Sequence, residues 1–215
     1  MIHRIALLLG VLASAPLQAQ TAPAALSDGP APAAIPKAAV VPVAIDTSLG
    51  RIVVVVDRGH APVTAANFLH YVDAHRFDGE SFYRAMQVAD GGLIQAGVRS
   101  DARKLFAPIA HEPTSRTGLH NVTGTLSMAR LAPGTATADF FILLSDMPGF
   151  DADAPGGDAD GFAAFGHVVE GMDVVKKIFV APVSATKGEG VMKGQMLDPV
   201  VRIITAARVP AAPAR

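Results

Sequence analysis

Short apolar runs separated by turn residues make up most of the chain from residue 43 onward. Between residues 43 and 58, two β-branched runs flank a Ser-Leu-Gly turn, a pattern typical of a β-hairpin. Many strands with few helices favour an antiparallel barrel or sandwich, and alternation alone does not choose between them. Further strand-like runs, bounded by Gly, Pro or Asp, lie at residues 81–86, 92–98, 124–130, 140–145, 163–169 and 201–209.

Helical spacing is found in two places. The first helix is expected within residues 61–76, where Pro62 suits the opening turn because that turn leaves its N–H groups unpaired. A second short helix is expected at about residues 172–179, ahead of the last strand. The apolar face of the first helix is predicted from the recurring positions Val63, Ala66, Leu69 and Val72.

The first 19 residues have the pattern of a secretory signal peptide. Arg4 precedes a short apolar run, and Ala19 supplies a small residue before the expected cleavage point. The run is shorter than the roughly 20 apolar residues of a membrane span, and Gly10 and Pro16 interrupt it. We therefore expect export to the periplasm, with no membrane span in the mature protein.

Composition divides the rest of the chain into a spacer, one domain and a tail. Residues 20–42 are rich in alanine and proline and lack any helical or alternating period, which predicts a spacer. Residues 43–209 suit a single domain, since roughly 100 to 200 residues bury a substantial core. Residues 210–215 are expected to form a disordered tail, and the protein is expected to be a monomer.

Charge and cysteine content exclude several classes of function. The formal net charge is −1, so the chain has no overall basic field to hold nucleic acid or an anionic membrane. The sequence contains no cysteine, which excludes disulfides, thiolate metal sites and a cysteine nucleophile.

The acidic segment 151–161 is the strongest candidate for a metal site. Asp151, Asp153 and Gly156 are spaced as in a calcium loop, but Pro155 and Phe162 stand where oxygen ligands are needed. We favour a solvated loop and expect no metal. A metal-binding or structural protein built around this loop is kept as a rival, for which calcium should raise the melting temperature.

Two polar residues are placed within apolar strand-like runs. Arg84 directly follows two aromatic residues, and Gln95 directly follows Leu93 and Ile94. By composition alone, a strand arginine that faces water is the commoner explanation. The order of the motifs around Arg84 and Gln95 instead favours a functional site.

Several motifs, taken in their order along the chain, resemble those of the cyclophilin-type peptidyl-prolyl cis-trans isomerases. The likeness runs from about residue 43 to residue 209. Its motifs are FDGESFYRAM, LIQAG, HNVTGTLSMARLAPGTATADFFILLSD and FGHVVEGMDVV. Because they occur in the family's order and near its spacing, the match is specific.

The resemblance implies both a fold and a reaction. The fold is all-β, a closed eight-stranded antiparallel barrel capped by two helices, with the active site in a groove on its outer face. The reaction is rotation about the bond before proline, without cofactor or covalent intermediate. The partners would be proline-containing segments of exported proteins during folding.

The resemblance also assigns roles to individual residues. Arg84 matches the catalytic arginine of the family, and Gln95 matches the glutamine that helps to hold the substrate carbonyl. The apolar wall that receives the proline ring would include Phe82, Met128 and Phe141. The full set of predicted substrate-binding residues is Phe82, Leu93, Met128, Ala129, Arg130, Asp139, Phe141, Phe150 and Phe162.

Two charged residues depart from the family pattern. Arg130 stands where an asparagine is common, and Asp139 stands where a glutamine is common. We interpret them as a possible ion pair that replaces the lost amide contacts. Reversing both charges should then alter activity.

Other departures affect the shape of the groove. Phe162 falls at the usual groove histidine, extra residues separate Arg84 from Gln95, and the acidic loop 151–161 is longer than usual. These changes leave an alternative open, namely a cyclophilin-shaped chaperone that binds peptides with little catalysis. Turnover of a short X-Pro peptide would distinguish the two.

Overall fold

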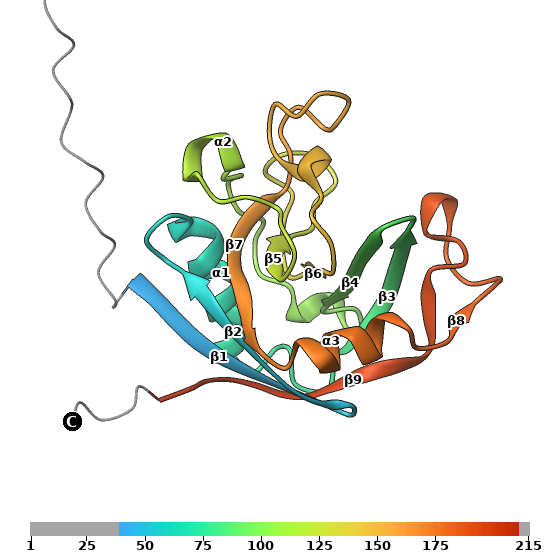
Figure 1. Cartoon of the computed structure of the whole chain (residues 1–215). Helices are drawn as coiled ribbons and strands as arrows, with labels where there is room; N and C mark the ends of the chain where they lie inside the picture. The colour runs from blue at the N-terminus through green and yellow to red at the C-terminus, as the bar shows by residue number, and fades with distance from the viewer. Residues whose placement is uncertain (1–38, 211–215) are drawn as a thin grey trace, which may run out of the picture. The chain divides into compact units, whose positions relative to one another are not determined.

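The computed structural model describes residues 39–210 (Figure 1). The predicted signal peptide, residues 20–38 of the predicted spacer and residues 211–215 lie outside the described residues. The helices are α1 (Pro62–Asp73), α2 (Thr114–Thr117) and α3 (Met172–Phe179). The strands are β1 (Val40–Thr47), β2 (Gly50–Asp57), β3 (Ser81–Val88), β4 (Gly91–Gly97), β5 (Thr125–Met128), β6 (Phe140–Leu143), β7 (Ala163–Glu170), β8 (Val183–Ser184) and β9 (Met196–Arg208).

The sheet closes on itself. Neighbouring strands follow the order β1-β2-β7-β5-β6-β4-β3-β9, and β1 pairs in turn with β9. Among the described strands, the short strand β8 pairs with β9 alone and is not part of the closed ring. Every pair is antiparallel, so the expectation of a closed eight-stranded antiparallel barrel is confirmed over the described residues. Closure leaves the barrel without a free edge that could pair with another chain.

The first hairpin illustrates how alternation builds the barrel wall. In β2, the residues Ile52, Val54 and Val56 are fully buried, whereas Val53 and Val55 between them are only partly buried. Side chains two residues apart share one face of a strand, so the first set fills the interior. β1 begins at Val40, inside the predicted spacer, because residues 40–42 already pair with β2.

Both predicted helices are present, but the buried face of α1 differs from the prediction. Val63 is 40% exposed and Ala66 is also exposed, so these two positions were wrongly assigned to the apolar face. The buried stripe follows Phe68 instead, because the Phe68 ring lies within 5.3 Å of three other core rings. Those rings belong to Phe77, Phe140 and Phe165, and the buried stripe of α1 includes Ala65, Phe68, Leu69 and Val72.

The other two helices are short. Helix α3 packs against the barrel through Val174, Val175 and Ile178, and α2 is a four-residue element that was not predicted. No helix within residues 39–210 combines the length and the hydropathy needed to cross a membrane.

Candidate active site

Two rows of side chains cross the outer face of three neighbouring strands. In the first row, Arg84 of β3 pairs with Gln95 of β4, and Gln95 pairs with Phe141 of β6. Because side chains two residues apart share a face, a parallel row lies beside it. That row consists of Met86, Leu93 and Leu143.

A β-bulge in β3 gives Arg84 its outward direction. The register with β4 shifts between Phe82 and Arg84, which makes Tyr83 an extra residue on its strand. Without the bulge, Phe82 and Arg84 would share a face. With it, Phe82 lies inside the barrel, where its ring centroid is 6.0 Å from that of Phe140.

Two residues predicted to bind substrate therefore belong to the barrel core. Phe82 is 0% exposed and Met128 is 2% exposed, and both lie in the main core cluster. The bulge turns Phe82 inward, and Met128 shares the interior face of β5 with Leu126. The prediction that Phe82 and Met128 line the proline pocket is wrong, because both side chains lie inside the barrel and not in the separate outer cluster that contains Leu93 and Phe141.

Two neutral amides hold the guanidinium of Arg84. Its Nη1 donates to Oε1 of Gln95 at 2.9 Å, and its Nε donates to Oε1 of Gln195 at 2.8 Å. Gln195 lies in the segment that leads into β9, and its backbone carbonyl accepts from the N–H of Ala85 at 2.9 Å. Figure 1 shows this segment beside the β3–β4 hairpin. Gln195 was not among the predicted site residues, because no local motif marks it.

The charge of Arg84 has no counter-ion among residues 39–210. Burial lowers the pKa of the guanidinium, but an arginine remains charged at neutral pH. Its Nη2 makes no hydrogen bond within the described part of the chain. An oriented cation with a free donor can therefore act on a group placed over the outer face.

An apolar cluster lies beside this cation. Leu93, Phe141 and Leu143 are buried and have partly buried apolar neighbours around them. Three phenylalanine rings of the cluster pack against one another. The ring centroid of Phe141 lies 5.6 Å from that of Phe150 and 5.3 Å from that of Phe162, and the centroids of Phe150 and Phe162 are 4.8 Å apart. The cluster brings together the predicted residues Leu93, Ala129, Phe141, Phe150 and Phe162 with the unpredicted residues Met86, Leu143 and Met147.

Alternation could have revealed two of the missed residues. Met86 follows Arg84 by two positions in β3, and Leu143 follows Phe141 by two positions in β6. Met147 lies after β6 in a segment without strand periodicity. Its place in the cluster depends on the fold, so no pattern in the sequence indicated it.

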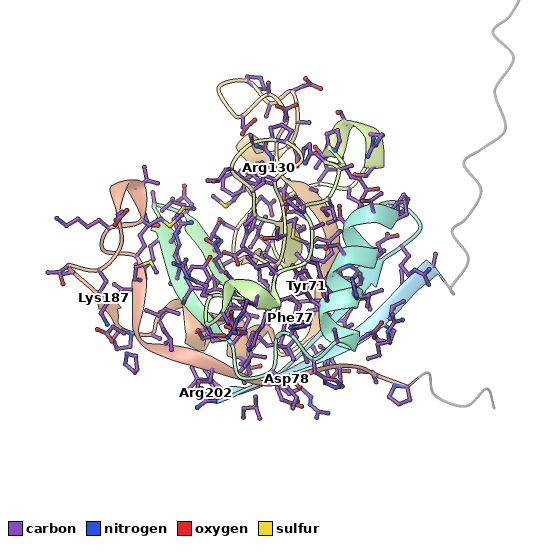
Figure 2. All side chains as sticks on the ribbon, turned by 180° about the vertical axis from the view of Figure 1, so that it is seen from behind. Tyr71, Phe77, Asp78, Arg130, Lys187 and Arg202 are labelled. Carbon is purple, nitrogen blue, oxygen red and sulfur yellow. The ribbon has the colours of Figure 1, made fainter. Side chains whose placement is uncertain are left out.

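Arg130 fastens the acidic loop to the barrel. Its Nη2 lies 3.0 Å from a carboxylate oxygen of Asp158, and its Nε donates to the Gly161 carbonyl at 3.0 Å. Its guanidinium carbon lies 5.1 Å from the centroid of the Phe162 ring. Figure 2 shows Arg130 beneath this loop. The predicted pair between Arg130 and Asp139 is wrong, because the loop supplies the partners of Arg130.

Asp139 has a different partner. The Tyr83 hydroxyl donates to its Oδ2 at 2.6 Å, and Arg99 lies over the Tyr83 ring at 4.4 Å. Burial raises the pKa of Asp139, and the hydrogen bond from Tyr83 opposes that rise. Asp139 and Gln95 line a pocket of about 250 Å³ that adjoins the apolar cluster at Ala129.

Asn121 organises the base of the acidic loop. Its Nδ2 donates to the carbonyls of Phe150 at 3.0 Å and Phe162 at 3.2 Å, and to Oδ1 of Asp151 at 2.8 Å. One buried amide thus holds two aromatic residues of the cluster at opposite ends of the loop. Residues 39–210 contain no group of three or more His, Asp or Glu side chains arranged to hold a metal ion.

These features define a class of protein: a closed antiparallel barrel whose outer face carries an oriented, uncompensated cation beside an apolar cluster. We call this surface the groove, defined by Arg84, Gln95 and the apolar cluster. A groove of this kind suits an extended peptide with one apolar residue inserted.

Comparison with known proteins identifies the family. The family model of "Cyclophilin type peptidyl-prolyl cis-trans isomerase/CLD" matches residues 42–206. The chain belongs to this family, and its activity is peptidyl-prolyl cis-trans isomerisation.

Bacterial relatives support the same conclusion. A peptidyl-prolyl cis-trans isomerase of Acinetobacter baylyi is 38% identical over 145 residues, which cover 66% of this chain and 73% of the relative. Peptidyl-prolyl cis-trans isomerase B of Escherichia coli is 37% identical over 139 residues, which cover 63% of this chain and 82% of the relative.

A solved structure supports the fold. The crystal structure of a cyclophilin type peptidyl-prolyl cis-trans isomerase from Cryptosporidium parvum aligns with a TM-score of 0.61 at 18% identity. The alignment covers 80% of this chain and 99% of that structure.

Proposed function

We propose that isomerisation takes place in the groove, with Arg84 as the catalytic residue, and that the substrates are exported proteins during folding. The observation that carries the first part is the fork of two amide oxygens on the Arg84 guanidinium. This pair of hydrogen bonds fixes a charged donor beside the apolar cluster without neutralising it.

The reaction sets a narrow physical demand. Rotation about an X-Pro bond meets a barrier of about 18 to 20 kcal/mol because it breaks the conjugation of the amide. In the twisted state the proline nitrogen recovers a lone pair, which can accept a hydrogen bond. A donor aimed at that nitrogen binds the twisted state better than the planar one. That difference in binding lowers the barrier.

Arg84 meets this demand. Its Nη1 and Nε donate to Gln95 and Gln195, so its Nη2 remains available to donate to the substrate. Because both partners are neutral, the full positive charge is available to the developing lone pair. Water exclusion by the neighbouring apolar side chains strengthens such an interaction.

The remaining parts of the groove position the substrate. The proline ring would insert into the apolar cluster next to Phe141, which is adjacent to Gln95 in register. The Oε1 of Gln95 accepts from Arg84, which leaves its Nε2 to donate to a substrate carbonyl. Catalysis then needs no metal, cofactor or covalent intermediate.

The proposal of exported substrates rests on the N-terminal sequence. A positive charge, a short apolar run and a small residue before the expected cut are typical of a signal peptide. We expect cells that express the full chain to contain a periplasmic protein beginning near Gln20. N-terminal sequencing of the periplasmic protein tests this, and a cytoplasmic protein that keeps residues 1–19 would contradict it.

The alternative is a protein that holds proline-containing segments without turning them over. Isomerisation of a short X-Pro peptide by the mature protein separates the two, since uncatalysed exchange takes tens to hundreds of seconds. We expect a clear rate increase that scales with enzyme concentration. Peptide binding without any rate increase would favour the holding function.

A further inference from the structure

A second pocket adjoins the apolar cluster. It has a volume of about 630 Å³ and lies between the β3–β4 turn, the segment after β6 and the acidic loop. This volume falls within the roughly 300 to 1,000 Å³ of ligand pockets, so it offers more room than one proline ring needs. Its lining is Val88, Ala89, Asp90, Ser145, Asp146, Met147, Gly149, Phe150, Gly156, Gly157, Asp158 and Phe162.

The pocket is continuous with the proposed proline site. Met147, Phe150 and Phe162 belong both to its lining and to the apolar cluster. A polypeptide whose proline occupies the cluster must extend beyond it, so a neighbouring side chain is brought to this pocket. The opposite walls come from the extra residues between Arg84 and Gln95 and from the long acidic loop, the two additions noted in the sequence.

The pocket combines an apolar wall with an acidic rim. Its charged lining residues are Asp90, Asp146 and Asp158, and no Lys, Arg or His is among the described residues that line it. Asp158 is partly compensated by Arg130 at 3.0 Å. Asp146 accepts from the backbone N–H and the hydroxyl of Thr123, both at 2.8 Å, and these bonds lower its pKa and keep it ionised.

We propose that this pocket binds a lysine or arginine side chain close to the proline of the substrate, which makes the enzyme selective for basic X-Pro segments. The long aliphatic part of such a side chain would pack on Phe150 and Phe162, and its charged end would reach Asp90 and Asp146. This selectivity rests on the proposed function, because it requires the proline to sit in the groove.

The test uses three sets of short X-Pro peptides, one set for each varied position: two residues before the proline, one residue before it, or one residue after it. Each set contains a lysine, a norleucine and a glutamate peptide. At low ionic strength we expect kcat/KM for lysine to exceed that for norleucine about fivefold at one position, equivalent to about 1 kcal/mol. Glutamate should be the poorest, and salt should reduce the ratio.

Matched variants locate the effect. In D90N/D146N the lysine-to-norleucine ratio should fall close to one, with the norleucine value unchanged. The control D153N/D160N removes the same charge from the acidic loop but outside the pocket lining, and it should keep the ratio. Equal rates for lysine and norleucine at every position, or a ratio that survives D90N/D146N, would overturn the proposal.

Separate measurements distinguish a failure of the proposed catalytic groove from a failure of the proposed basic-residue pocket. The R84A variant should bind lysine peptides more tightly than norleucine peptides by the same factor, as measured by calorimetry. Lack of turnover by the wild-type protein would count against the catalytic role of the groove, whereas equal dissociation constants would count against the basic-residue pocket.

Discussion

The guanidinium of Arg84 receives its orientation from neutral groups. A carboxylate would orient it equally well, but would also form an ion pair and weaken the charge that the reacting nitrogen meets. Gln95 and Gln195 supply acceptor oxygens without that cost, from β4 and from the segment before β9. If Arg84 is the catalytic residue, as we propose, Gln195 is a positioning residue that acts through it.

Variants of Gln195 test this role. We expect Gln195→Ala to lower kcat about tenfold, about 1.4 kcal/mol, with KM little changed, because the loss affects the transition state. Gln195→Glu keeps the shape and the acceptor but adds a counter-ion, and it should lower kcat at least as much. Stopped-flow peptide assays give both constants. A Gln195→Glu enzyme with wild-type kcat would mean that Gln195 has only a structural role.

Asp139 makes stability depend on pH. Burial raises its pKa above the unfolded value of about 3.9, so the folded state binds this proton more tightly. The stability that Asp139 contributes is present below that value and is lost as pH rises through the folded pKa. Asp139→Asn keeps an acceptor for the Tyr83 hydroxyl and removes the titration.

We therefore expect the unfolding free energy of the wild type minus that of Asp139→Asn to decrease as pH rises from about 4. Urea unfolding of both proteins over a series of pH values measures this difference. A difference that stays constant with pH, or increases with it, would show that Asp139 does not titrate above its unfolded value.

At the scale of elements, two irregular features build the groove. The bulge at Tyr83 turns Arg84 outward, and the loop 151–161 brings Phe150 and Phe162 onto the apolar cluster. β-Bulges commonly re-aim a side chain next to an active site. The loop is held by contacts with the rest of the domain, among them those of Asn121 and those of Arg130, whose side chain is only 2% exposed.

Replacing Arg130 with methionine should loosen this loop. Methionine retains packing on Phe162 but leaves the Gly161 carbonyl without its donor, and we expect a loss of about 2 kcal/mol in stability. KM should rise about fivefold with kcat nearly unchanged, because Phe162 shifts while Arg84 does not. Asp158→Asn is the control and should have a smaller effect, since Asp158 is 42% exposed. Unchanged KM in Arg130→Met would contradict the role of the loop in binding.

Apolar runs bounded by turn residues predicted the strands, and the resemblance assigned Leu93, Gln95 and Phe141 to the groove; these three residues lie on the outer face of β4 and β6. The resemblance failed at Phe82, since a bulge depends on the pairing with the neighbouring strand and leaves no mark on its own strand. The partner of Arg130 was missed for a related reason. The loop that supplies Asp158 folds back by contacts that no local pattern encodes.

At the scale of the whole molecule, the order of motifs predicted the barrel, and long-range pairing completed it. Closure requires β1 to pair with β9, which comes from the other end of the domain. The same return of the chain brings Gln195 to Arg84 across 111 positions of sequence. A resemblance based on the order of short motifs identifies the fold and Arg84. It does not identify Gln195, which lies beside Arg84 only because the barrel closes.

The most direct test of the central claim compares the mature protein with its Arg84→Ala variant on one X-Pro peptide, with isomerisation and binding measured separately. We expect kcat/KM to fall about a hundredfold, equivalent to roughly 3 kcal/mol of transition-state preference, while the peptide dissociation constant and the melting temperature change little. An Arg84→Ala protein that folds, binds the peptide and isomerises it at the wild-type rate would contradict the assignment of catalysis to Arg84.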